Sequence, residues 1–138
     1  MGRILGADYG EARTGLAISD ESQTLASPLT AWEKRNKQSL VEHLHGLVKE
    51  YEVEKMVLGF PLNLDGSLGK MAQAVLDLKE ELSKTIGLEI ILWDERLSSV
   101  SARRHLKEHQ ISTKRKKSVV DTISAVLILQ SYLDGLKK

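Results

Sequence analysis

The sequence predicts an α/β fold in which a mixed β-sheet is flanked by helices, within a single domain over residues 1–138. Three observations lead to this prediction. Strand-like segments dominate the first 32 residues, short apolar strands then alternate with amphipathic helices, and the chain has no internal repeat. We expect right-handed crossovers between the parallel strands.

The first part of the chain is expected to form three meandering strands, at residues 3–9, 14–18 and 25–32. Residues 10–13 form the tip of the hairpin between the first two. Pro28 favours an edge position for the third strand, because proline cannot donate a hydrogen bond to a neighbouring strand.

The remainder of the chain is expected to hold two further strands and four helices. In chain order they are a helix over 38–51, a strand over 55–60, a helix over 71–87, a strand over 89–93, a polar helix over 98–109 and a last helix over 118–136. The two strands are short and apolar, which is typical of parallel strands that are buried on both faces.

The composition narrows the class of protein. The absence of cysteine excludes disulfides, thiolate metal sites and a cysteine nucleophile, and it suits the reducing cytoplasm. The N-terminus lacks the layout of a signal peptide, and no apolar run approaches the roughly 18 residues of a membrane span. We therefore expect a cytoplasmic protein without a membrane partner.

Positive charge is concentrated in one stretch, although the net charge is only +1. Between Arg96 and Ser118 the sole acid is Glu108, and the basic residues are Arg96, Arg103, Arg104, Lys107, Lys114, Arg115, Lys116 and Lys117. This asymmetry indicates a polyanionic partner. Taken alone, the run at 114–117 is more typical of a solvated loop than of a nucleic-acid contact, and Arg103, Arg104 and Lys107 favour the contact.

An aspartate lies inside the first predicted strand. Burying Asp8 is unfavourable unless something compensates its charge. Because side chains alternate along a strand, Asp8 shares a face with Gly6 and Gly10, so we expect it to stand on an open shelf that a ligand or another backbone can approach. The alternative is that Asp8 only accepts hydrogen bonds from nearby backbone groups.

Two further acids lie at positions that could meet Asp8. Glu95 follows the last predicted strand, where its alternative role is an ion pair with Arg96 or plain exposure. Asp121 fits a capping box that begins at Ser118, a motif that usually only starts a helix. However, Asp121 shares a helical stripe with apolar residues that should pack on the sheet, and the helix dipole would favour its ionised form in a first turn.

Three carboxylates brought together would repel one another unless a cation neutralised them. Hard oxygen ligands without cysteine or histidine suit Mg²⁺ or Mn²⁺. Such a cluster is typical of two-metal phosphodiester hydrolysis. Whether the three acids converge cannot be read from the sequence.

Four motifs in order resemble the YqgF family, which is also called RuvX-like. The matching positions are residues 8–15, Gly59 to Pro61 with residues 65–67, residues 94–98, and Asp121. The resemblance covers the whole chain. It implies a ribonuclease H-like fold with sheet order 3-2-1-4-5, made of three antiparallel and two parallel strands. It also implies a cytoplasmic nuclease that processes the 5′ end of pre-16S rRNA during ribosome biogenesis.

The same resemblance implies roles for individual residues. Asp8, Glu95 and Asp121 would be the catalytic acids and would bind two ions of Mg²⁺ or Mn²⁺, with Asp94 as the alternative to Glu95. The motif positions and the basic residues together predict the contacts with structured RNA, in pre-16S rRNA or the pre-ribosome. These contacts are Arg13, Asn63, Ser67, Lys70, Arg96, Arg103, Arg104, Lys114, Arg115, Lys116 and Lys117.

Three other functions remain open at this stage. A resolvase of four-way DNA junctions would use the same chemistry on branched DNA. Its two symmetric cuts require a two-fold dimer. The sequence shows no evident dimer interface and leaves the oligomeric state open. An ATP-binding protein is suggested by Asp8, Gly10 and Gly15, yet 138 residues supply one lobe where two enclose the nucleotide, so we expect no nucleotide cofactor. An RNA-binding assembly factor without catalysis is the third.

Overall fold

The computed structural model describes residues 2–33, 36–97 and 114–136, and for residues 114–121 it describes the backbone alone. The elements are β1 (Arg3–Tyr9), β2 (Arg13–Ser19), β3 (Ala26–Glu33), α1 (Lys37–Glu50), β4 (Val53–Phe60), α2 (Lys70–Thr85), β5 (Glu89–Asp94), the 3-10 turn η1 (Glu95–Leu97) and α4 (Lys114–Gly135). The helix predicted over 98–109, with Arg103 and Arg104, lies outside the described residues.

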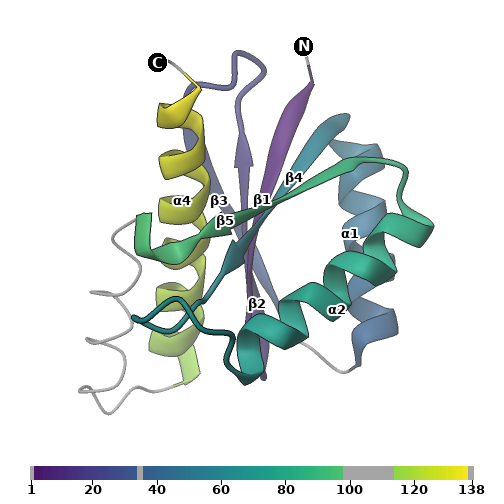
Figure 1. Cartoon of the computed structure of the whole chain (residues 1–138). Coiled ribbons are helices and arrows are strands. Elements are labelled where there is room, and N and C mark those ends of the chain that lie inside the picture. Colours follow the sequence, from purple (N-terminus) through teal and green to yellow (C-terminus); the bar gives the residue numbers. More distant parts are fainter. Residues whose placement is uncertain (1, 34–35, 98–113, 137–138) are drawn as a thin grey trace.

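The five strands form one mixed sheet in the order β3-β2-β1-β4-β5 (Figure 1). Strand β2 pairs antiparallel with β1 and with β3, whereas β4 pairs parallel with β1 and with β5. The predicted fold class and strand order are therefore confirmed. Strand β3 lies at the edge of the sheet, as Pro28 indicated, and Pro28 pairs with Ala17.

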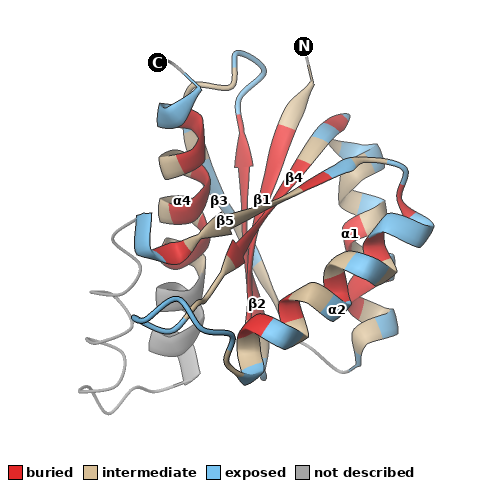
Figure 2. Ribbon diagram, in the orientation of Figure 1, coloured by how far each residue is buried: buried red, intermediate tan, exposed pale blue. Residues whose placement is uncertain are grey.

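The sheet is covered by helices on both faces. Helices α1 and α2 lie on one side and α4 lies on the other, and the residues between the layers are buried (Figure 2). Alternation along β1 sorts its side chains: Leu5 and Ala7 belong to the core under α1 and α2, and Ile4 belongs to the core under α4. This sorting fixes the face on which each later residue of β1 lies.

Helix α4 begins earlier than the sequence indicated. It starts at Lys114, so Ser118 lies inside the helix and is not its N-terminal cap. The predictions of a capping box at Ser118 and of a solvated loop over 114–117 are therefore wrong. The physical reason is that lysine and arginine are good helix formers and that neither glycine nor proline separates them from the apolar stretch that follows.

Within the described part of the chain, none of the helices has the length and the apolar character that crossing a membrane requires.

Glycine allows α4 to approach the sheet closely. A Cβ atom added at Gly6 would lie 2.8 Å from the Cβ of Leu129, near the middle of α4. The side chain of Leu129 thus covers Gly6, and Asp8 has an exposed fraction of only 5%. The expected open shelf along β1 is therefore wrong, because the element that approaches the glycine is the chain's own helix.

We predict that Gly6→Ala destabilises the fold, by about 1–3 kcal/mol, because the added methyl meets a Cβ atom that cannot rotate away. Urea denaturation measures the free energy of unfolding. The matched control is Gly46→Ala in α1, where nothing lies within 4 Å, and which we expect to stabilise the helix by up to about 1 kcal/mol. Equal effects of the two substitutions would contradict the close packing at Gly6.

Candidate active site

Asp8 is the next-to-last residue of β1 and lies on the face that α4 covers, because it alternates with Gly6 and Ile4. On the antiparallel side it pairs with Gly15 of β2. On the parallel side Ala7 pairs with Leu58, so that the next residue of β4 beside Asp8 is Gly59. Both neighbouring strands therefore present a glycine beside the buried carboxylate.

Glu95 lies on the same face of the sheet as Asp8. The chain leaves β5 after Asp94 and turns into η1, and this turn directs Glu95 back over Gly59. A Cβ atom added at Gly59 would lie 3.3 Å from Oε2 of Glu95, and Glu95 has an exposed fraction of 5%. The two carboxylates are thus buried beside one glycine, at the carboxyl end of the parallel strands. The alternative that the side chain of Glu95 is simply exposed to solvent is therefore wrong.

Asp94 lies on the opposite face and pairs with Arg96. The preceding residue, Trp93, belongs to the core under α4, where its Nε1 donates to Oγ of Ser131 over 3.0 Å. Asp94 therefore faces the other way, and its Oδ2 accepts from the Nε and NH2 groups of Arg96 over 3.0 and 2.7 Å. These hydrogen bonds lower the pKa of Asp94 and raise the pKa of Arg96. Asp94 is thus engaged with Arg96, whereas Glu95 lies on the other face of the sheet over Gly59.

Position 121 lies in the half of α4 nearest to the two acids. The helix runs antiparallel to β1: Leu129 covers Gly6, whereas Thr122 lies beside Thr30 and Ala31, at the end of the sheet where β1 ends. Position 121 comes one helical turn before Ala125, which is fully buried in the core under α4. The side chain of Asp121 lies outside the described residues, so the structure brings together two of the three acids.

The expected influence of the helix dipole on Asp121 is not supported. Because α4 begins at Lys114, position 121 lies in the second turn of the helix. The field of the helix N-terminus acts mainly within the first turn. The residues of that first turn are instead the four basic positions 114–117, whose side chains lie outside the description.

Five of the predicted nucleic-acid contacts have described side chains, and they lie around this end of the sheet. Arg13 begins β2 beside the hairpin, and its Nε is buried without a hydrogen-bond partner among the described residues. Asn63 and Ser67 bond to each other through their side chains, Nδ2 to Oγ over 2.9 Å, within the loop that follows β4. Lys70 is exposed at the first position of α2. Arg96 is engaged with Asp94 and with the carbonyl of Leu64.

The comparison with known families is decisive. A family model described as RuvX, Holliday junction resolvase, matches residues 2–135. The chain belongs to the RuvX family. Two curated relatives carry the name "Putative pre-16S rRNA nuclease". The one from Thermoanaerobacter pseudethanolicus is 43% identical over 136 residues, covering 98% of each chain, and the one from Halalkalibacterium halodurans is 42% identical over 134 residues, covering 96% of each.

Solved structures share the fold of this RuvX chain. The RuvC of T. thermophilus, in complex with a Holliday junction substrate, is 10% identical with a TM-score of 0.61, covering 98% of this chain and 96% of that one. The Fowlpox virus resolvase, in complex with Holliday junction DNA, is 11% identical with a TM-score of 0.56, covering 99% of each chain. The sequence-based expectation of a ribonuclease H-like fold and of membership in this family is confirmed.

The donor atoms of the RuvX chain fit a hard divalent cation. Asp8 and Glu95 supply buried carboxylate oxygens beside Gly59, where a methyl group would crowd Oε2 of Glu95. Such oxygens suit Mg²⁺ or Mn²⁺. The described side chains contain no group of three acids, histidines or cysteines that could hold a metal, and the side chain of Asp121 lies outside that description.

Sequence reasoning quoted Gly59 as part of a motif but missed its role. The signal that could have found it is a glycine near the end of a strand that is otherwise apolar and buried, since such a glycine often marks close approach of another group. Here that group is the carboxylate of Glu95 together with Ile128 of α4, whose Cδ1 would lie 2.5 Å from an added Cβ.

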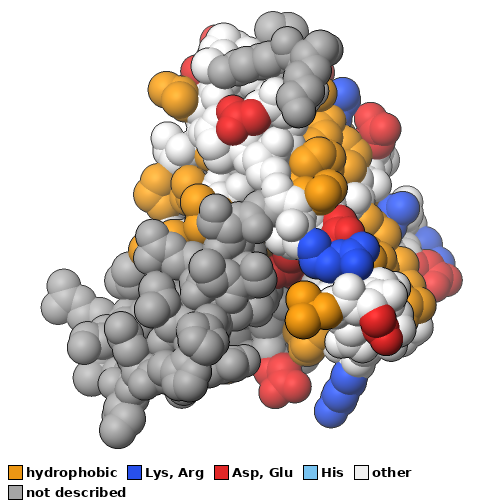
Figure 3. Space-filling model, turned by 60° about the vertical axis from the view of Figure 1, so that its left-hand side comes forward, with side chains coloured by type: hydrophobic (Ala, Val, Ile, Leu, Met, Phe, Trp, Pro, Cys, Tyr) orange, Lys and Arg blue, Asp and Glu red, His pale blue; other side chains and the backbone are white. Residues whose placement is uncertain are grey.

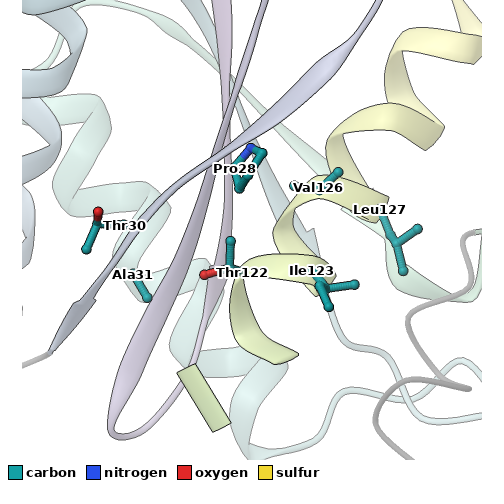
Figure 4. A pocket seen from close by; sticks show the side chains of 7 residues that line it. All are labelled: Pro28, Thr30, Ala31, Thr122, Ile123, Val126 and Leu127. Carbon is teal, nitrogen blue, oxygen red and sulfur yellow. The ribbon is translucent and has the colours of Figure 1, made fainter. Parts of the chain in front are cut away.

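A cavity of about 470 Å³ lies between the edge strand β3 and α4 (Figure 4). It is lined by Pro28, Thr30, Ala31, Thr122, Ile123, Val126 and Leu127. These side chains are apolar or carry a single hydroxyl, so the cavity offers no charged ligand for a metal or a phosphate. The chemistry of the RuvX chain is therefore expected at the carboxylates and not in this cavity.

The ion pair between Asp94 and Arg96 predicts a pH-dependent stability. A carboxylate whose pKa is lowered by folding contributes stability above its unfolded pKa, near 3.8, and loses it as the pH falls through the folded value. We expect Arg96→Ala to lower the free energy of unfolding at pH 7 by up to about 1 kcal/mol, because both side chains are partly exposed. Urea denaturation between pH 7 and pH 3 should show the difference closing below about pH 4.

The control for this measurement is Lys84→Ala, which breaks the exposed i,i+4 pair with Glu80. We expect it to change the stability by less than about 0.5 kcal/mol at every pH. A difference between wild type and Arg96→Ala that stays constant down to pH 3 would show that Asp94 is not the partner that matters.

Proposed function

We propose that this RuvX chain is a metal-dependent nuclease that hydrolyses phosphodiester bonds in structured RNA, at the 5′ end of pre-16S rRNA. The observation that carries the proposal is the burial of Asp8 and Glu95 on one face of the sheet beside Gly59. The names of the curated relatives support the choice of substrate. Processing of precursor rRNA corresponds to a cytoplasmic location.

In this proposal Asp8, Glu95 and Asp121 are the metal ligands and the catalytic acids. Mg²⁺ or Mn²⁺, as a pair of ions, would supply Lewis-acid polarisation of the phosphodiester. The protein's own contribution is to hold two carboxylates in a buried position where neighbouring strands carry glycine. At Gly59 the missing side chain leaves room for the carboxylate of Glu95 and for Ile128 of α4, which pack over the bare backbone.

Basic residues around the acids would bind the flanking phosphates. Arg13 and Lys70 lie on β2 and at the start of α2, and the basic run at 114–117 begins α4 at the same end of the sheet. Contacts of this kind make affinity fall with rising salt, with a slope that scales with the number of phosphates neutralised. Arg96 is assigned a different role, because its guanidinium already holds Asp94 and the loop.

A second candidate function is the resolution of four-way DNA junctions. It is favoured by the description of the matching family model. Two symmetric cuts would require two copies of the chain. The same purified protein can be incubated with both substrates. Cleavage of RNA or of the DNA junction distinguishes the two nuclease functions, and binding of RNA without cleavage would indicate an assembly factor.

We predict that Asp8→Asn abolishes cleavage while RNA binding is kept. The substitution removes the charge that holds a metal and leaves the shape of the side chain, so the cleavage rate should fall at least about a hundredfold. The measurement is incubation of precursor RNA, or of a four-way DNA junction, with Mg²⁺ or Mn²⁺, followed by gel analysis. The matched control is Asp77→Asn, an exposed carboxylate in α2. Equal cleavage by wild type and Asp8→Asn would refute the catalytic assignment.

A second pair of variants distinguishes the adjacent acids. We predict that Glu95→Gln loses cleavage as Asp8→Asn does, because it removes the carboxylate above Gly59. In contrast, Asp94→Asn should keep most of the activity and lose only the part of the stability that the pair with Arg96 contributes, about 1 kcal/mol or less. Cleavage rate and urea denaturation are measured on each variant. The reverse order of cleavage rates would assign the ligand to Asp94.

A further inference from the structure

Apolar side chains are exposed at the end of the sheet that holds the two acids. Of the described residues, five large hydrophobic side chains are exposed, and three of them, Leu64, Leu68 and Leu97, belong to the loop after β4 and to η1. Leu64 is the most exposed, at 91%. A single exposed leucine on a protein surface is ordinary, but a group of them on two adjoining segments indicates a contact surface.

The loop that carries Leu64 is held in a fixed shape by its own hydrogen bonds. The backbone N–H of Gly66 donates to the carbonyl of Asn63 over 2.8 Å, and the N–H of Asn63 donates to the carbonyl of Ser67 over 3.0 Å. Oδ1 of Asp65 accepts from both the N–H and the hydroxyl of Ser67, which lowers the pKa of Asp65. Leu64 is therefore presented to solvent by an ordered turn.

Arg96 fastens this turn beside the acids. Its guanidinium is fixed on Asp94, and its NH1 donates to the carbonyl of Leu64 over 3.4 Å. Arg96 directly follows Glu95, the candidate ligand. The hydrogen bond from Arg96 therefore ties the backbone of Leu64 to the segment that carries Glu95. Figure 3 shows hydrophobic side chains on either side of a basic side chain on the face that it presents.

The chemistry of a nucleic acid accounts for an apolar residue at this place. Phosphates are bound by charged and polar groups, whereas a leucine has no hydrogen-bonding group to offer them and packs instead against the faces or edges of bases. Proteins that distort nucleic acids insert leucine, among other apolar side chains, between neighbouring bases and unstack them. A base displaced in this way exposes the backbone on its flank.

We propose that Leu64 is a wedge that packs against an unstacked base of the bound nucleic acid and so brings the adjoining phosphodiester to Asp8 and Glu95. This inference rests on the proposed nuclease function. It assigns to Leu64 a positioning role, with Leu68 and Leu97 as the neighbouring apolar surface.

The test uses a substrate with the fluorescent base 2-aminopurine beside the bond that the wild-type chain cuts, in precursor RNA or in the DNA junction, whichever is cleaved. Fluorescence is read in the Asp8→Asn background, so that the substrate is bound but intact. Three changes are compared: Leu64→Ala, the conservative Leu64→Met, and Leu25→Ala as a matched control. Leu25 has an exposed fraction of 62% and lies between β2 and β3, at the opposite end of the sheet.

We expect binding of the intact chain to raise the fluorescence several-fold, and Leu64→Ala to remove most of that rise. With Asp8 present, Leu64→Ala should cut about tenfold more slowly, because unstacking is no longer assisted. Affinity should change by less than about threefold, since phosphate contacts supply most of it. Leu64→Met should retain the fluorescence and the rate, and Leu25→Ala should match the wild type. Circular dichroism confirms that each variant is folded.

Failure of the inference and failure of the proposed function give different results. If the wild type cuts a substrate and Leu64→Ala shows the same fluorescence and rate, the wedge is wrong while the nuclease stands. An equal loss of fluorescence and cleavage rate in Leu25→Ala would also overturn the wedge. So would a Leu64→Ala variant whose only change is its oligomeric state, as measured by size-exclusion chromatography. If the wild type cuts neither RNA nor DNA, the proposed function fails, and the wedge fails with it.

Discussion

The close contact between α4 and the sheet is the constraint on which the other features depend. At Gly6 and at Gly59 an added methyl group would lie 2.8 and 2.5 Å from side chains of α4, so the helix packs against bare backbone. Because protein interiors are close-packed, this contact fixes the distance and the direction of the helix. The same contact sets the depth of the two carboxylates, since Glu95 and Ile128 both adjoin Gly59.

Burial of two like charges opposes folding, and the rest of the structure has to offset it. A carboxylate moved out of water is unfavourable unless it is paired, hydrogen-bonded or bound to a cation. Asp8 and Glu95 each have an interaction partner. Two apolar cores, one on each face of the sheet, also stabilise the fold, together with β4, whose residues Met56 to Leu58 are buried on both faces. Acids buried within an otherwise consistent fold are a feature typical of functional sites.

Much of this fold could be predicted from the sequence, because alternation and helical periodicity are local properties. The bounds of β1 and the edge position of β3 followed from residues within each segment. So did the prediction that Asp8 is a carboxylate inside a buried strand. The strand order came from family resemblance. The start of α4 was mispredicted because Ser118 and Asp121 also fit a capping motif, and a local motif cannot show that the preceding residues continue the helix. The site needs contacts between distant segments, such as Glu95 over Gly59, which no local pattern contains.

The two adjacent acids at the junction of β5 and η1 lie on opposite faces of the sheet and have different surroundings. Alternation sends Asp94 to one face, where it holds Arg96, and the turn into η1 sends Glu95 to the other, beside Asp8. Arg96 in turn holds the carbonyl of Leu64. The loop and the candidate ligand are therefore connected through two consecutive residues and one guanidinium.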